Sequence, residues 1–498
     1  MKKTTILFFS AVILLAVLFG AYQTTAIRDA VANVLPLSVK QSLKDTLFYI
    51  PSMRERLAVK TAEVEQLQIS VEQVQRDSVA AIRAVNQAAR RRALADLSGN
   101  KTLAWQHLAR VYSQTANQLL LKKSASRILS ADDGRKYTLD MYEMPFLPTA
   151  LAFGYKPLFY IDTTDTDVYL LTGNGVLFRA AKTTINDEFL SISTVPTNLR
   201  QMLPDEAIYN PGWFSIKDLT IRQGKAYISY TKKIGAEYTL AILEAEVNSQ
   251  RWDFKEFFVI DETVSTSGHF NAHQVGGRIV DYKDNKLLIS TGDFRKWEKG
   301  QDESSLLGKI FSIDIDTKQT ELISRGHRNV QGLSYDPQSG VILSTEHGPN
   351  GGDEINLNTS VGSEIVNFGW PIASYGLHYD SRFHEQAPLL KSHSEHGFAE
   401  PLLSFTPSIG ISEIIKLPNS FADGFSNDYF AASMGLNTQV AIYSLHHIRL
   451  DQQYNEIVKK SVIRIGERIR DMHLLTENQL LLSLEGNNTP ALAVLRAQ

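Results

Sequence analysis

The sequence predicts an all-β six-bladed β-propeller, preceded by an N-terminal membrane anchor and an α-helical spacer. Three observations lead to this prediction. Strand-like runs joined by polar turns recur about six times in the C-terminal part of the chain. A long stretch without glycine or proline precedes them, and an apolar run behind two lysines opens the chain. We therefore expect three parts, at residues 1–26, 27–129 and 130–498.

The composition is that of an ordinary globular protein, with 43% hydrophobic and 21% charged residues in a chain of 498. The 51 basic and 54 acidic residues give a net charge of −3, which offers no sign of a nucleic-acid partner. The chain has no cysteine, so disulfides, thiolate metal sites and a lipid-modified N-terminal cysteine are excluded. The absence of cysteine does not fix the compartment.

The first residues follow the order of a secretory signal or a signal anchor. Lys2 and Lys3 precede an apolar run from Ile6 to Ala21. The run is long for the core of a signal peptide and slightly short for a membrane-spanning helix of ~20 residues. Thr24-Thr25-Ala26 is a poor cleavage site, which favours an uncleaved anchor, and a buried core helix is disfavoured behind two lysines. With the lysines held in the cytoplasm, we expect a periplasmic protein attached to the inner membrane.

The next segment has the pattern of helices. Residues 54–97 contain no glycine or proline, and Ser98-Gly99-Asn100 would end the helix. Lys101 to Lys123 reads as a second helix. Two interpretations remain open: a helical hairpin or stalk that offers a homo-oligomer contact, or two amphipathic helices packed on their own domain. The apolar residues recur at heptad spacing, as Leu57, Val64 and Val71 and as Leu67 and Val74.

Beyond a linker at Ser130–Thr138 the period of the sequence changes. Strand, polar turn and strand alternate near residues 168, 218, 276, 331, 425 and 469, with turns such as NG, QG and KDN. A propeller buries such sheets against neighbouring blades and leaves only short edges. A large sandwich is the alternative architecture, but it predicts no repeat.

One loop combines irregular backbone with charge. Residues 345–357 read TEHGPNGGDEINL, where three glycines and a proline exclude a helix or a plain strand. The flanking GVILST and EINL are strand-like, so the segment is a loop between strands. A glycine-rich turn exposes carbonyls, and adjacent acids favour a hard cation such as calcium. The alternative is a solvated acidic turn.

Four motifs in this part of the chain resemble the signature of the glucose/sorbosone dehydrogenase family. This family comprises soluble glucose dehydrogenases and aldose sugar dehydrogenases that depend on pyrroloquinoline quinone (PQQ), and its fold is a six-bladed propeller. The resemblance covers about residues 140–498. The motifs are Gly326-His327-Arg328-Asn329 with Gln331-Gly332, Glu346-His347-Gly348-Pro349, Gly351-Gly352-Asp353-Glu354-Ile355-Asn356, and Asn367-Phe368-Gly369-Trp370-Pro371.

The resemblance implies a calcium ion that contacts the quinone. The carbonyls of Gly348 and Pro349 would bind this ion, and Asp353 and Glu354 complete the expected metal set. Glu354, with the backbone near Phe368, would help hold a second, structural calcium. Carbonyl and carboxylate oxygens are the ligands that calcium prefers.

The implied chemistry is hydride transfer from the sugar C1 to the quinone, which needs a base on the C1 hydroxyl and a cation near the quinone carbonyls. By resemblance, Arg328 would stabilise the quinone as it is reduced, and Asn329 would hydrogen-bond it. Ser408 falls where the family has a cofactor-contacting hydroxyl. Arg468 and Arg470 match the arginines that grip cofactor carboxylates, and residues i and i+2 of a strand share a face. Surface cations on an exposed strand are the alternative for this pair.

The base is where the chain departs from the family pattern. The family places a histidine four residues before the arginine of its GGR-like segment, but His273 precedes Arg278 by five residues, and Gln274 holds the four-residue position. Asp293 matches the carboxylate that orients the base. Either a one-residue bulge restores His273 as the base, or the base is lost, because a one-residue slip turns a side chain to the other face. His269 is a further candidate.

Two cofactor contacts have no counterpart. The family's lysine on the fifth blade is absent from residues 432–437, and its glutamine turn has no clear match near residues 210–213. Losing one charged contact costs ~1.5–3 kcal/mol, or roughly tenfold to a hundredfold in affinity.

Three functions follow from these patterns. The first is a quinoprotein that oxidises an aldose or related saccharide with PQQ and calcium and passes electrons to an external acceptor. The second is a non-redox propeller that binds a glycan or a partner protein. The third is a propeller hydrolase or lactonase that uses the bound cation.

Overall fold

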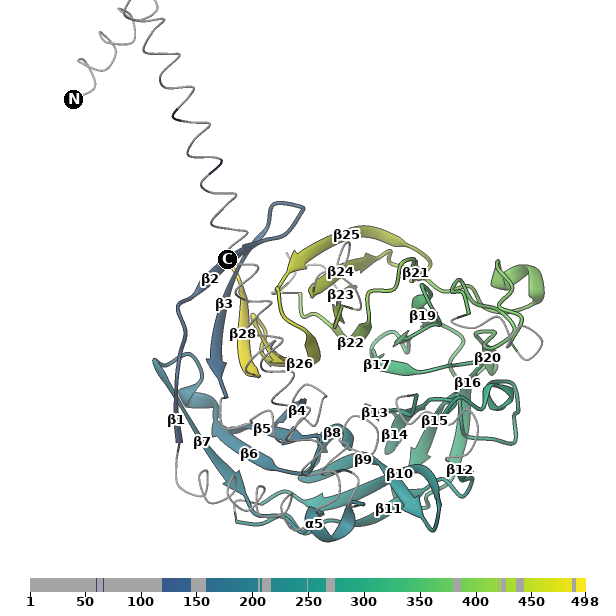
Figure 1. Ribbon diagram of the computed structural model, residues 1–498, viewed down its shortest axis with the longest axis horizontal. Helices are drawn as coiled ribbons and strands as arrows, with labels where there is room; N and C mark the ends of the chain where they lie inside the picture. Colours follow the sequence, from purple (N-terminus) through teal and green to yellow (C-terminus); the bar gives the residue numbers. More distant parts are fainter. Residues whose placement is uncertain are drawn as a thin grey trace, which may run out of the picture. The chain divides into compact units, whose positions relative to one another are not determined.

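The computed structural model shows a closed propeller of six sheets (Figure 1). Most of the predicted spacer and the whole anchor, Ile6–Ala21, lie outside the described residues. Within the described residues, no helix is long and apolar enough to cross a membrane. The structure describes Lys60 and Gln66 in helical conformation, and residues 119–144, 158–204, 207, 216–248, 250–265, 274–378, 387–419, 421, 427–435, 443–485 and 490–498.

The first three blades follow the chain in order, each from its inner strand outward. Blade 1 comprises β4 (Phe159–Thr163), β5 (Asp167–Thr172), β6 (Leu177–Ala181), β7 (Phe189–Val195) and β1 (Leu119–Lys122). Blade 2 comprises β8 (Ile216–Arg222), β9 (Lys225–Ile234), β10 (Glu237–Glu246) and β11 (Lys255–Val259), with β12 (Val264–Ser265) paired to β10. Blade 3 comprises β13 (Gly276–Tyr282), β14 (Lys286–Thr291), β15 (Lys309–Asp314), β16 (Thr320–Arg325) and β20 (Val366–Asn367).

The last three blades complete the ring. Blade 4 comprises β17 (Val330–Tyr335), β18 (Ile342–Glu346), β19 (Asp353–Asn358) and β21 (Leu403–Phe405). Blade 5 comprises β22 (Ile411–Lys416), β23 (Asp428–Ser433), β24 (Ser444–Leu450) and β25 (Ile457–Arg464). Blade 6 comprises β26 (Ile469–Thr476), β27 (Gln479–Leu484), β28 (Ala491–Ala497), β3 (Lys136–Glu143) and β2 (Arg127–Ser130). The short helices are η2 (Lys182–Thr184), α5 (Leu199–Met202), η3 (Trp297–Gly300) and η5 (His393–His396).

Strands from the two ends of the propeller pair with each other and thereby close the ring. Strand β28 pairs antiparallel with β3, so blade 6 combines the C-terminal strands with strands from before blade 1. Strand β1 pairs with β7 of blade 1, and its four residues are a strand where the sequence analysis expected the end of a second helix. Leu121 is buried while Leu120 is 60% exposed, which is the two-residue alternation of an edge strand. The propeller sheets therefore begin at Leu119, ahead of the expected linker.

The core lies between the faces of neighbouring blades. Phe159, Leu170 and Phe178 of blade 1 pack with Leu481 and Val494 of blade 6 in one buried cluster. Because each sheet has apolar neighbours on both faces, its strands carry apolar runs as well as alternating patterns. The repeated hairpins in the sequence arise from this arrangement.

The motif residues share one end of the propeller. In an antiparallel blade, the start of the first strand and the connection from the second to the third strand lie at the same end. Gly326-His327-Arg328-Asn329 leads into β17, and Arg468 and Arg470 open β26. The loop His347–Gly352 joins β18 to β19, which confirms that this segment lies between strands. This shared end is called the motif face below.

Five of the six inner strands have a register shift near the motif face. The shifts fall at Lys217 in β8, at Gly277 and Arg278 in β13, and at Gln331 in β17. Two more occur between Ile411 and Ile414 in β22 and between Ile469 and Asp471 in β26. A β-bulge re-aims the side chains beside it, and bulges are common next to binding sites.

Candidate functional site

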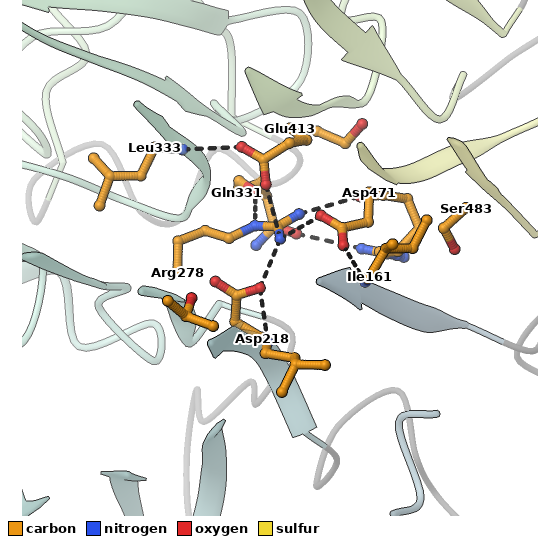
Figure 2. A network of polar contacts seen from close by, with 12 residues as sticks. Ile161, Asp218, Arg278, Gln331, Leu333, Glu413, Asp471 and Ser483 are labelled. Carbon is orange, nitrogen blue, oxygen red and sulfur yellow. Dashed lines mark hydrogen bonds and ion pairs between the residues drawn. The ribbon is translucent and has the colours of Figure 1, made fainter. Parts of the chain in front are cut away.

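Arg278 lies at the centre of a buried ion cluster formed by inner strands (Figure 2). Its Nη1 donates to Asp218 Oδ1 at 2.9 Å and to Asp471 Oδ1 at 2.7 Å, and it pairs with Glu413 Oε2 at 2.8 Å. Its Nε and Nη2 donate to backbone carbonyls of β17 and β26. One arginine of blade 3 thus contacts side chains or backbone from four other blades.

The three carboxylates also fasten the blades to one another. Burial raises the pKa of Asp218 to about 7 and raises that of Glu413, although Arg278 acts against both shifts. The cluster borders a cavity of about 300 Å³, which Asp162, Asp281 and His473 also line. Each carboxylate accepts a hydrogen bond from a neighbouring blade's inner strand: Asp218 from Ile279 N, Glu413 from Leu333 N, and Asp471 from Ile161 N. All three carboxylates have structural partners, so we assign this cluster to the stability of the ring.

A second polar group lies at the motif face, around Arg328. With its amide oriented to satisfy both atoms, Gln274 donates to Asp293 Oδ1 at 2.9 Å and accepts from Arg328 Nη2 at 2.8 Å. Arg328 also donates from Nη1 to His347 O at 2.7 Å and lies 5.4 Å from the Trp370 ring centroid. Asp293 Oδ2 accepts from Trp370 Nε1 at 2.8 Å. The structure therefore connects Asp293 to Arg328 through a neutral amide.

Asp293 is completely buried, and this burial raises its pKa to about 7 although Arg328 acts in the opposite direction. His273 and His269 lie outside the described residues, so the role of His273 as a base stays a prediction. Gln274 makes the contact with Asp293 that the family resemblance assigns to the base. A carboxamide does not accept a proton from a hydroxyl at neutral pH, so this position carries no general base.

A chain of amides links Arg328 to the arginine pair. Asn329, which follows Arg328, accepts at Oδ1 from Gly276 N at 3.3 Å and from Gln331 Nε2 at 3.1 Å. Arg470 Nη1 in turn donates to Gln331 Oε1 at 3.5 Å. The segment before β17 and the start of β26 are thus connected on the motif face.

Arg468 and Arg470 share one acid. Their Nε atoms donate to Glu485 Oε2 and Oε1, each at 2.6 Å, so the two side chains do lie on one face of the strand. Burial acts to raise the pKa of Glu485, but the two guanidiniums hold it at about 2. Arg468 also donates to the carbonyls of Met434 and Gly435. Two arginines with one carboxylate leave a net positive charge on this part of the face.

The glycine loop is closed by its own backbone and by Ser408. A Cβ on Gly348 would lie 1.7 Å from Gly352 O, so only glycine fits there. Gly352 N donates to Pro349 O at 3.2 Å, and Ser408 Oγ accepts from the amides of Gly351 and Gly352 at 3.1 Å. In the structure the Ser408 hydroxyl therefore holds the loop.

The two acids of the loop differ in their partners. Asp353 Oδ2 accepts from the backbone amides of Ile409 and Ile411, at 3.1 and 3.0 Å, and so joins blade 4 to blade 5. Glu354 is 4% exposed, and its pKa is raised well above the usual range by burial and by the nearby Glu346.

His393 lies beside Glu354 and is another buried polar side chain of this region. It is 1% exposed, its Nε2 is 3.7 Å from Glu354 Oε1, and neither ring nitrogen has a hydrogen-bond partner among the described residues. Buried acids beside an unsatisfied ring fit a bound cation, which would compensate the charge. Across the described ranges, no group of three or more His, Cys, Asp or Glu side chains has the arrangement of a metal site.

Comparison with known proteins gives one family match. A family model described as Glucose / Sorbosone dehydrogenase matches residues 220–493. An uncharacterized protein of Synechocystis sp. is 29% identical over 260 residues, which are 47% of this chain and 58% of that protein. The aldose sugar dehydrogenase of Escherichia coli is 31% identical over 173 residues, 32% of this chain and 43% of that protein. Quinoprotein glucose dehydrogenase B of Acinetobacter calcoaceticus is 35% identical over 134 residues, 21% of this chain and 27% of that protein.

These curated relatives are matched over about half of their length or less. Among solved structures, a glucose dehydrogenase superposes with a TM-score of 0.54 at 22% identity, covering 68% of this chain and 96% of that one. The apo-form of the soluble aldose sugar dehydrogenase from Escherichia coli gives 0.53 at 17% identity, covering 77% and 100%. At these identities the structural likeness shows the shared fold.

Proposed function

Because the chain belongs to the glucose/sorbosone dehydrogenase family as a divergent member, we propose that it is a quinoprotein dehydrogenase that oxidises an aldose or a related saccharide. Two of its relatives are named as an aldose sugar dehydrogenase and a quinoprotein glucose dehydrogenase. The proposal includes PQQ and calcium as cofactors and an external acceptor for the electrons.

One observation carries this proposal: Arg328, Arg468 and Arg470 all lie on the motif face, where the pair Arg468 and Arg470 shares the single carboxylate of Glu485. The excess positive charge suits a planar ligand with several carboxylates, which is the chemistry of PQQ. Arginine is well suited to this task because its fork of donors matches a carboxylate. The residues therefore fit the cofactor in charge and in donor type.

When bound, the quinone supplies the acceptor for a hydride, and the protein supplies position and charge. Arg328 is anchored to the His347 carbonyl and to Gln274, so its guanidinium is held in place before any ligand enters. Such a fixed cation stabilises negative charge on a neighbouring oxygen without reorganisation. His273 is the proposed acceptor of the sugar hydroxyl proton, with Asp293 as the carboxylate that orients it.

For calcium, Gly348 and Pro349 are the proposed carbonyl ligands beside the quinone, because only glycine fits at position 348 of this tight loop and carbonyl oxygens are ligands that calcium prefers. Glu354 is the proposed ligand of a structural cation. Asp353 and Ser408 would mainly stabilise the loop and would not bind the cation, because their oxygens already accept hydrogen bonds from backbone amides.

The proposed location is the periplasmic side of the inner membrane, with Ile6–Ala21 as the anchor and residues 27–118 as the main part of a helical spacer that also offers a homo-oligomer contact. This part of the proposal rests on Lys2 and Lys3 and on the glycine-free segment 54–97. A reporter enzyme fused after Leu97 tests it, and activity found only in the cytoplasm would contradict it.

A second candidate is a non-redox propeller that binds a glycan or a partner protein. The contact of Gln274 with Asp293 favours it, because a carboxamide stands where a base is expected. Purified protein reconstituted with calcium and PQQ separates the two candidates. Quinone binding with dye-linked sugar oxidation supports the dehydrogenase, whereas no oxidation of any tested sugar by quinone-loaded protein supports the binding propeller.

A further inference from the structure

We propose that Trp370 is a positioning residue of the motif face, which holds the carboxylate of Asp293 through its indole N–H and the guanidinium of Arg328 against its ring. The inference rests on the proposed function, because it takes Asp293 and Arg328 as groups that act on the substrate and the quinone. Trp370 belongs to the motif at residues 367–371, and the sequence predicts no role for its side chain.

The indole of Trp370 contacts both charged groups. Its Nε1 donates to Asp293 Oδ2 at 2.8 Å, and its ring centroid lies 5.4 Å from the guanidinium carbon of Arg328, within the range of a cation–π interaction. Asp293 N also donates to Arg328 O at 3.0 Å, which joins the backbones of the two residues. One side chain therefore sets where the carboxylate lies relative to the guanidinium.

Trp370 is itself held from several sides. It is 4% exposed and packs in a buried apolar cluster with Trp297. Its N donates to Gly326 O at 3.0 Å, and its O accepts from Gln301 Nε2 at 2.7 Å. A Cβ on Gly300 would lie 2.8 Å from Trp370 O and 3.2 Å from its Cδ1, so this backbone closes against the residue. A side chain locked by packing and hydrogen bonds in this way can fix the groups that it contacts.

The indole N–H favours the ionised form of Asp293. The Oδ2 atom of the acid accepts from Trp370, and its Oδ1 accepts from Arg295 N at 2.7 Å and from the Gln274 amide. Burial raises the pKa of Asp293 to about 7, whereas Arg328, Arg295 and the Trp370 donor act in the opposite direction. Loss of the indole N–H should therefore keep Asp293 protonated to a higher pH.

The first test is the pH dependence of urea unfolding of the apoprotein. Trp370→Phe keeps an aromatic ring beside Arg328 but removes the donor to Asp293, which raises the folded-state pKa of the acid. The stability lost in this variant should therefore grow between about pH 5 and about pH 9, by roughly tenfold in the unfolding equilibrium constant for each added pKa unit. Trp252→Phe is the matched control, because Trp252 Nε1 donates to the neutral Asn248 O at 2.8 Å, and its loss of stability should not change with pH.

A second measurement separates the ring from the donor. Trp370→Leu removes both contacts, and calorimetric titration of the calcium-loaded protein with PQQ should give a Kd roughly threefold to thirtyfold above that of wild type. Trp370→Phe should bind the quinone within about twofold of wild type, because its ring still lies beside Arg328. If Trp370→Leu does not fold, the pH measurement on Trp370→Phe decides alone.

The outcomes distinguish this inference from the proposed function. A stability difference between wild type and Trp370→Phe that stays constant with pH would overturn the role of the indole N–H and leave the proposed function standing. Equal Kd in wild type and folded Trp370→Leu would overturn the role of the ring. A wild-type protein that binds no quinone would overturn the proposed function, whereas the unfolding measurement on the apoprotein would still decide whether Trp370 holds Asp293.

Discussion

Two buried arginines, Arg278 and Arg328, differ in their surroundings. Arg278 has three carboxylates within 3 Å, whereas the described contacts of Arg328 are a neutral amide, a backbone carbonyl and an indole ring. Arg328 also acts electrostatically on the buried Asp293, where it opposes the rise of the pKa that burial causes. The difference supports our assignment of Arg278 to the stability of the ring and our proposal that Arg328 contacts a ligand.

The largest effect on stability should come from the structural arginine. Arg278→Met leaves three buried carboxylates without a counter-charge, and breaking a buried ion pair costs about 3–5 kcal/mol. Arg328→Met should cost less, because among the described contacts it leaves behind one acid, Asp293, whose pKa burial raises to about 7, instead of three. Urea unfolding of the two variants measures this contrast. Equal losses of unfolding free energy in the two variants would contradict the assignment of Arg278 alone to the stability of the ring.

The next effect concerns turnover. If His273 is the base, His273→Gln should lower sugar oxidation by ~10²-fold or more while quinone binding stays nearly intact, since general bases contribute ~10²–10⁴. Gln274→His is the matched variant, because it places an imidazole against Asp293. Stopped-flow reduction of the bound quinone measures both variants. If His273→Gln reduces the quinone at the wild-type rate and Gln274→His reduces it faster, the natural chain has lost its base.

A smaller effect should come from calcium. A cation that binds only the folded state stabilises it by ~2.7 kcal/mol at a hundredfold excess over Kd. Chelation should therefore lower the melting temperature, and Glu354→Ala should remove most of that sensitivity. Asp353→Asn is the control, because its carboxylate is engaged with backbone amides. An unchanged melting curve after exhaustive chelation would mean that the loop needs no metal.

A further effect should be a pH dependence at Asp293. Its pKa is raised from 3.8 to about 7 in the folded protein, so folding favours the protonated acid. The contribution of Asp293 to stability is therefore fully present below about pH 4 and falls as the pH rises toward 7. Asp293→Asn should flatten the unfolding free energy over that interval. An identical pH profile in wild type and variant would contradict the raised pKa.

The fold was largely predictable because its signals are local. Each blade supplies strand–turn–strand units, and the family motifs lie in connections that the structure brings to one face. The prediction of a helix was wrong for strand β1, because Leu119, Leu120 and Leu121 fit a helix as well as an edge strand. Only the pairing of β1 with β7 shows that this segment is a strand. Short apolar runs carry this ambiguity in general.

The candidate site was less predictable because its partners are distant in sequence. Glu485 contacts Arg468 and Arg470 only because the hairpin of β26 and β27 brings them together. The acids that pair with Arg278 lie on blades 2, 5 and 6. In the sequence these acids look like ordinary strand residues. The repeated bulges that turn Lys217 and Gln331 are a property of strand pairing, which no local pattern reveals.

The central claim is that the motif face binds an anionic quinone through cations that the ring does not need for its own stability. Calorimetric titration of the calcium-loaded protein with PQQ, in wild type and in Arg328→Met, tests it most directly. We predict one quinone per chain with a micromolar or lower Kd in wild type, and at least tenfold weaker binding in a variant that still folds. Absence of binding to the wild-type protein at micromolar concentrations, or equal binding by the variant, would contradict the claim.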